Sequence, residues 1–172
     1  MQSSAANILV THDLLDAVAL GDRMIVIEAG AVVQTGTPTE VTARPRSAYV
    51  ADLTGVNLLR GTGHGTVLDL DGASRLTCAR AAAGPTFAVI APAAVAVSRE
   101  RPEGGPAGEG VNTWRGRVSA VDLMGDRVRV RVDGTPAITA EVLPAAVDHL
   151  KLDEGGDLWV CLSPAAITTY PR

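Results

Sequence analysis

The stretch "FAVIAPAAVAVS" at residues 87–98 recurs as "WVCLSPAAITTY" at residues 159–170. Each stretch starts as an apolar run typical of a buried strand, breaks at Pro-Ala-Ala, and resumes with Val or Ile. A second motif, "NLLRG" at residues 57–61, recurs as "NTWRG" at residues 112–116, in the same order relative to the first. Two motifs that repeat in the same order indicate two copies of one small structural unit.

The sequence around these repeats predicts an all-β region at residues 57–172. Short Val-rich segments alternate there with Gly, Asp and Pro turns. Residues 128–132 alternate strictly, so we expect the valines to face the core, with Arg129 and Arg131 facing solvent. The copies are expected at about residues 57–98 and 112–170, joined by an exposed linker at residues 99–111.

The second copy is longer than the first because of "LPAAVDHLKLDEGGD" at residues 143–157. This insertion predicts a short helix from about Pro144 to His149, followed by a turn. A pair of such copies can close a small Greek-key barrel, which removes exposed sheet edges.

Residues 1–56 show a different pattern, in which strands and helices alternate. Residues 8–10 are typical of a buried strand of a parallel sheet, and Asp13 can cap the helix that follows. Three short strands cannot bury their own faces, so we predict an α/β remnant of a larger domain. The remaining elements expected here are strands at residues 24–27 and 32–34, and helices that begin at Thr37 and Ser47.

Composition limits the classes of function. The net charge is -4, only 3% of residues are aromatic, and no Lys/Arg cluster occurs, so binding of nucleic acid is disfavoured. Cys78 and Cys161 are too few and too far apart in the sequence for a disulfide framework or a metal site. No apolar run approaches the length of a membrane span, and we expect a soluble, cytoplasmic protein.

The pattern "VTHD...A..GDR..V.E.G.VVQ.GTP.EV...P....V..L.G..N" at residues 10–57 resembles the C-terminal end of the ATP-binding subunit of an ABC-type importer. The region after it is similar to the tandem transport-associated oligomer-binding-fold (TOBE/Mop-like) domain of such subunits. The resemblance implies a remnant of a nucleotide-binding domain at residues 1–56. It also implies an oligomer-binding-fold-like small barrel, built from two repeats, at residues 57–172.

The same resemblance gives His12 the role of the switch histidine. In that family this residue follows a sheet strand, contacts the γ-phosphate and helps to position the attacking water. An imidazole on a rigid strand end is suited to donate to an anionic transition state. A structural role at the start of the helix is the alternative for His12.

Several parts of a complete ATPase are missing from the sequence. There is no G-x-x-x-x-G-K-[ST] phosphate loop, no Ser-Gly-Gly-Gln signature, and no Walker B strand before His12. One histidine does not position Mg²⁺ and the phosphates, so we expect no ATP turnover and no cofactor for this chain alone. ATP and Mg²⁺ would belong to the complete subunit, of which this chain is expected to be the back part.

Within the family, residues 92–118 most resemble the molybdate importers. There, two segments help to coordinate the oxyanion through backbone amides, hydroxyl groups and a lysine. The matching positions are occupied here by Val111 and Asn112 in one segment and Ser163 in the other, with Glu109 nearby and without the lysine. The missing cation and the added carboxylate disfavour an anion, but the amides and the Ser163 hydroxyl could still bind one.

Two further functions stay open beside an accessory role in an importer ATPase. One is a stand-alone module that binds molybdate or tungstate, and the other is a nucleic-acid binder. The family resemblance implies an ABC permease and the missing nucleotide-binding half as partners, a homodimer, and a peripheral position at the inner face of the membrane. We expect His64 and His149 to be surface residues, and Trp114 and Trp159 to lie in the core or an interface.

Overall fold

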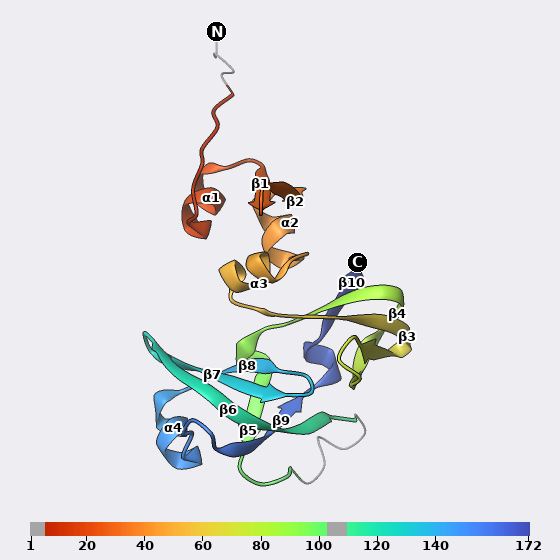
Figure 1. Cartoon of the computed structure of the whole chain (residues 1–172), viewed down its shortest axis with the longest axis vertical. Helices are drawn as coiled ribbons and strands as arrows, with labels where there is room; N and C mark the ends of the chain where they lie inside the picture. Colours follow the sequence, from red (N-terminus) through yellow and green to blue (C-terminus); the bar gives the residue numbers. More distant parts are fainter. Residues whose placement is uncertain (1–5, 103–109) are drawn as a thin grey trace. The chain divides into compact units, whose positions relative to one another are not determined.

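The computed structural model describes residues 6–102 and 110–172, and the chain separates into two units, Met1–Thr54 and Gly55–Arg172. Helices and a two-stranded hairpin form the first unit, whereas the second consists almost entirely of strands (Figure 1). Each unit has its own group of buried apolar residues.

The first unit confirms the predicted helices and the predicted hairpin. Asp13 caps the first helix, since its Oδ1 accepts hydrogen bonds from the backbone N–H groups of Leu15 (2.7 Å) and Asp16 (3.2 Å). Thr37 and Glu40 form a capping box at the second helix, and the Thr37 backbone amide, then its hydroxyl, lowers the pKa of Glu40. The elements are α1 (Leu14–Leu20), β1 (Met24–Glu28), β2 (Ala31–Gly36), α2 (Pro38–Ala43) and α3 (Ala48–Thr54).

The predicted strand at residues 8–10 is wrong. These residues form no strand, and the side chains of Ile8 and Val10 are 93% and 90% exposed. A strand needs a hydrogen-bonding neighbour, and the described part of this unit contains only the antiparallel pair β1–β2. The parallel sheet expected from the apolar run is therefore not present, and the α/β remnant of a nucleotide-binding domain is not confirmed.

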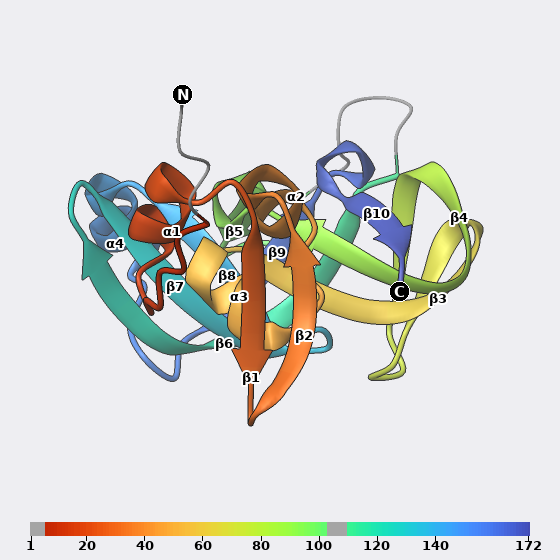
Figure 2. The same cartoon turned by 90° about the horizontal axis from the view of Figure 1, so that it is seen from above.

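The second unit contains two sheets that exchange their last strands. The strand orders of the two sheets are β10-β4-β3 and β5-β9-β6-β7-β8. The last strand of the first copy, β5, pairs with β9 of the second copy, and the last strand of the second copy, β10, pairs with β4 of the first. Figures 1 and 2 both show β10 beside β4. The elements are β3 (Asn57–Leu70), β4 (Arg75–Ile90), η1 (Pro92–Ala94), β5 (Val95–Ser98), β6 (Asn112–Met124), β7 (Arg127–Gly134), β8 (Ile138–Val142), α4 (Pro144–Leu150), β9 (Asp157–Leu162), η2 (Pro164–Ala166) and β10 (Thr168–Pro171).

The repeated Pro-Ala-Ala motif marks the point where the chain crosses from one sheet to the other. In both copies it forms a single 3₁₀ turn with proline at the first position, where a missing N–H costs nothing. The apolar residue after each turn, Val95 or Ile167, is buried. The motif thus redirects the strand and fixes it in the shared core.

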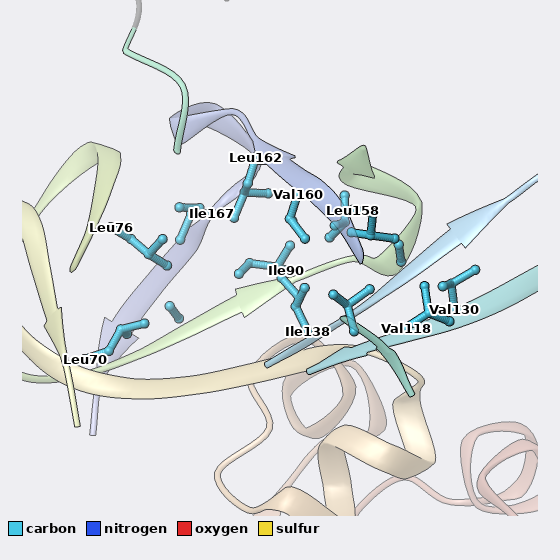
Figure 3. Close-up of a cluster of buried hydrophobic side chains, with 14 of the residues drawn as sticks. Leu70, Leu76, Ile90, Val118, Val130, Ile138, Leu158, Val160, Leu162 and Ile167 are labelled. Carbon is cyan, nitrogen blue, oxygen red and sulfur yellow. The ribbon is translucent and has the colours of Figure 1, made fainter. Parts of the chain in front are cut away.

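One continuous core joins the two copies. Ile90 of β4 lies in the middle of this cluster, among side chains that include Ile138 of β8 and Val160 of β9 (Figure 3). The predicted alternation of β7 is confirmed for Val128, Val130 and Val132, which are all buried. On the other face of β7, Arg131 is exposed, as predicted, and pairs with Asp122 at 2.9 Å. The prediction is wrong for Arg129, which is half-buried, and its Nε is buried without a hydrogen-bond partner among the described residues.

The glycine of each "N-x-x-R-G" motif allows another stretch of strand to approach its backbone closely. A Cβ atom added at Gly61 would lie 2.3 Å from the carbonyl oxygen of Asp69, and one at Gly116 would lie 2.3 Å from Val132 Cγ1. The strand β3 folds back beside itself at this point, where the Asp71 amide donates to the Arg60 carbonyl at 3.0 Å. The second recurring motif is therefore also a packing motif.

Replacement of Gly61 tests this constraint. Gly61→Ala is expected to lower the free energy of unfolding by about 2 kcal/mol, because the backbone around Asp69 has to move. Urea denaturation of both variants measures the change. Gly72→Ala is the control, since its Cβ would meet nothing within 4 Å. Equal midpoints for the two variants would contradict the close approach.

The two cysteines should differ in reactivity. Burial raises the pKa of the Cys78 thiol, and its side chain is only 3% exposed, so it stays protonated and shielded at neutral pH. Cys161 is half-buried on β9. Iodoacetamide should modify Cys161 in the native protein and Cys78 only after unfolding, as read by peptide mass spectrometry. Modification of Cys78 at the same rate as Cys161 would show that the core around β4 opens readily.

Candidate functional site

The three oxyanion candidates lie at the same end of one strand pair. Asn112 opens β6 and is opposite Leu162 of β9 in the register, and Ser163 comes directly after Leu162. Val111 precedes Asn112 and is half-buried, while Ser163 is exposed. The structure therefore brings residues from the two predicted segments together. Glu109, which was expected beside them, lies outside the described residues.

The side-chain amide of Asn112 is occupied by the backbone. Its Nδ2 donates to the carbonyl oxygens of Thr77 (2.9 Å) and Leu162 (3.2 Å), and its Oδ1 accepts from the Thr77 amide (2.7 Å). These three bonds use both donors and the acceptor of the amide. Asn112 therefore holds the strand end in place, and its side chain has little capacity left for an anion.

Ser163 caps the 3₁₀ turn η2. Its Oγ accepts a hydrogen bond from the Ala165 amide at 3.3 Å, which leaves the hydroxyl proton free to be donated. In the first copy the matching residue is Ala91, which makes no side-chain cap. The hydroxyl is thus a feature of the second copy alone, and it makes the two crossover turns chemically different.

The charges near the strand pair are largely balanced. Arg115 and Arg117, farther along β6, both contact the Asp157 carboxylate, at 3.2 Å and 3.6 Å. These pairs are on the surface, so each contributes little to stability, but together they reduce the positive potential of this face. An anion at the strand end would depend mainly on backbone amides and the Ser163 hydroxyl.

Two arginines after β5 make contacts that the sequence did not indicate. Arg99 donates to the carbonyl oxygens of Leu150, Lys151 and Asp157, at the end of α4 and the start of β9. Arg101 lies over the ring of Trp159, 5.4 Å from its centre. The start of the predicted linker therefore holds the second copy. No sequence signal could have shown this, because a long side chain can reach many backbone carbonyls.

His12 lies on the exposed segment before α1, between Thr11 and the capping residue Asp13. The Thr11 hydroxyl accepts a hydrogen bond from the backbone amide of Asp13, the capping residue of α1, at 3.0 Å. This bond ties the residues on both sides of His12 to the start of the helix. Because residues 8–10 form no strand, the structure does not show His12 on a strand end. Its role as a switch residue stays a prediction.

The other singled-out side chains do not form a chemical site. His64 and His149 are exposed, as expected, and His64 lies 3.9 Å from the Asp69 carboxylate. Trp114 packs against the core and donates from Nε1 to the Pro136 carbonyl at 3.0 Å. Within residues 6–102 and 110–172, no three His, Cys, Asp or Glu side chains are grouped so that they could hold a metal ion.

In the parts of the chain that the structure covers, no helix is both long enough and apolar enough to cross a bilayer.

Part of the second unit matches a known protein family. Residues 108–168 match the TOBE domain, which covers most of the second copy. The chain as a whole is similar to import ATP-binding proteins and matches a C-terminal piece of an ABC importer ATPase that carries a TOBE domain. The resemblance predicted from the sequence motifs is therefore confirmed.

Two curated relatives show how far this similarity extends. The molybdenum import ATP-binding protein ModC of Mycobacterium tuberculosis (strain CDC 1551) is 33% identical over 99% of this chain and 47% of its own length. The molybdate/tungstate import ATP-binding protein WtpC of Pyrococcus horikoshii is 26% identical over 94% of this chain and 46% of its own. The chain thus spans about half the length of these relatives.

A solved structure agrees with the β architecture. The cytoplasmic molybdate-binding protein ModG, crystallised with molybdate bound, matches 67% of this chain and 96% of its own with a TM-score of 0.55. At 16% identity, this likeness establishes the fold alone. The chain is therefore mostly β, with a half-barrel sheet that resembles the oligomer-binding fold of ModG. The single closed barrel expected from the two copies is not seen in the described residues of the second unit, which form two open sheets.

Proposed function

We propose that this chain is the C-terminal accessory and regulatory portion of an ABC importer ATPase for molybdate or a related oxyanion. One observation carries the proposal: the similarity to ModC runs through 99% of this chain but reaches only 47% of ModC. Both units take part in that match, so the first unit is proposed to complete a nucleotide-binding domain and the second to brace it.

The surface of the first unit supports a missing partner. Helix α1 buries none of its residues, and Leu15 and Leu20 are 77% and 73% exposed. On the hairpin, Ile25 and Ile27 of β1 are also exposed. A large exposed apolar surface of this kind is typical of a binding face. We propose that the nucleotide-binding half of the subunit covers it, and that an ABC permease is then the partner of the complete subunit.

The chain's own residues supply no cradle for phosphates. The sequence contains no phosphate loop, so binding of ATP and Mg²⁺ is assigned to the missing half, and no turnover is expected from this chain alone. Within a complete subunit, His12 is proposed to donate to the γ-phosphate and orient the attacking water. The complete subunit is proposed to form a homodimer at the inner face of the membrane.

Reconstitution with the N-terminal half of ModC tests the accessory role. The purified chain should co-elute with that half in size-exclusion chromatography, and the pair should hydrolyse ATP. Leu15→Asp should abolish co-elution, because it places a charge in the apolar contact. Leu123→Asp is the matched control, since Leu123 is equally exposed but lies on the second unit.

In the same assay, His12→Ala should lower ATP turnover about 100-fold without loss of co-elution. His64→Ala, which removes another exposed histidine, should have no effect. Failure of the wild-type chain to bind the ModC half, or equal turnover in the two histidine variants, would contradict the proposal.

The second candidate is a stand-alone module that binds molybdate or tungstate. It is favoured by the likeness to ModG, which covers 96% of that protein. The proposed ligands are the Val111 and Asn112 backbone amides together with the Ser163 hydroxyl, which lie at one strand end. Because these groups are neutral, the affinity is expected to be modest.

Calorimetric titration with molybdate, tungstate and sulfate tests this candidate. Ser163→Asp should lower the affinity for molybdate about tenfold or more, because it adds a negative charge beside the anion. Ser119→Asp is the control, an exposed serine of β6 whose hydroxyl contacts only the Arg131 carbonyl. Equal molybdate affinities in the two variants would show that the anion binds elsewhere. If the wild-type chain gives no heat of binding with any of the three anions, the stand-alone binding function is contradicted.

A further inference from the structure

The recurring asparagine of the "N-x-x-R-G" motif makes the same contacts in both copies. Asn57 donates from Nδ2 to the carbonyl oxygens of Thr139 (2.8 Å) and Ile90 (3.3 Å), and its Oδ1 accepts from the Thr139 amide (2.7 Å). Asn112 makes the matching three bonds to Thr77 and Leu162. Each asparagine therefore bonds the backbone of a threonine that belongs to the other copy.

These threonines lie on open stretches of sheet edge. Thr139 is on β8, the last strand of the order β5-β9-β6-β7-β8. Thr77 is on β4, and β10 covers β4 only at residues 86–89. On the side of β4 that faces away from β3, Thr77 therefore has no neighbouring strand among the described residues. In an antiparallel sheet one residue directs its N–H and C=O to the same side. The N–H and C=O of each threonine, which the asparagine bonds, are thus the backbone groups that have no partner on a neighbouring strand.

A side-chain amide is chemically the same group as a peptide. Its N–H donates to the C=O of the threonine and its oxygen accepts from the N–H of the same threonine, as the backbone of a residue on a neighbouring strand would do. Each asparagine therefore takes the place of a single residue of a neighbouring strand. Unpaired edge groups would otherwise be free to pair with another chain. The asparagine closes this position with a group that cannot be extended into a further strand.

The third bond connects the same amide to the crossover point. Ile90 and Leu162 are the last residues of β4 and β9, each followed by one residue and then by the proline of the 3₁₀ turn. Each asparagine thus joins three parts: the first strand of its copy, the crossover of its copy, and the edge of the other copy.

We propose that Asn57 and Asn112 act as reciprocal clasps, which lock the two strand-exchanged copies together and close an edge on each. Each clasp consists of the asparagine amide, the threonine backbone of the other copy and the carbonyl before the crossover. The two clasps differ in exposure: the bonds of Asn57 to Thr139 are partly buried, whereas those of Asn112 to Thr77 are exposed. This inference does not depend on the proposed function.

Amide hydrogen exchange, measured by NMR on the full chain, tests the clasps. Asn57→Ala should speed exchange of the Thr139 amide at least about tenfold, since a lost bond of about 1.4 kcal/mol corresponds to that factor. The amides of β5 should also exchange faster, because its crossover is released. Asn112→Ala should do the same to the Thr77 amide and to β10, with a smaller factor because this clasp is exposed.

Val147→Ala is the control. Val147 packs against the core from α4, which supplies no group to the hydrogen bonds of either clasp, so this variant should lower protection only through unfolding of the whole unit. Faster exchange at Thr139 or Thr77 without a change in β5 or β10 would show an isolated hydrogen bond, which would overturn the locking role. The same pattern of rates in all three variants would overturn it as well.

Two further measurements keep the test decisive if an alanine variant does not fold. Asn57→Asp and Asn112→Asp keep an acceptor for the threonine amide but turn a carboxylate oxygen toward the two carbonyl oxygens. The amides of β5 and β10 should therefore exchange faster in these variants, while the Thr139 and Thr77 amides keep their acceptor. In the wild type, the Thr77 and Thr139 amides should be clearly protected. Exchange of these two amides at the rate of unstructured chain would overturn the proposal without any variant.

Discussion

The exchange of last strands between the two copies is the constraint on which the rest of the second unit depends. Since β5 pairs with β9 and β10 with β4, neither copy contains a complete sheet of its own. The core is continuous across the copies for the same reason. The proline turns lie at the crossovers where this exchange begins. The proposed asparagine clasps join the two copies that it links.

The two units differ in how much of their apolar surface is exposed to solvent. The second unit buries most of its large apolar residues in one core, and its fold resembles that of ModG, of which the match covers 96%. The first unit exposes much of its apolar surface, with a core of only a few valines. This contrast supports the proposal that the second unit is a finished module, while the first completes its core with another segment of an ATPase.

At the strand end near Ser163, the arrangement of polar groups favours a weak anion site over a strong one. The asparagine amide is used by the backbone, and the nearby arginines share one carboxylate. What is left for an anion is a hydroxyl and backbone amides, which select by geometry more than by charge. The proposed oxyanion site belongs to the second copy, where Ser163 stands at the position of Ala91 in the first.

The sequence by itself determined the two regions, the internal repeat and most helices and strands, because periodicity, caps and turn residues act locally. It also indicated the importer family, because many residue types recur over a long stretch. It failed at residues 8–10, where an apolar run is not sufficient without a neighbouring strand. Only the tertiary structure decided the strand exchange, the contacts of Arg99, and the use of Asn112 as a backbone partner. These features join residues far apart in the chain, and which distant groups meet depends on how the strands pack.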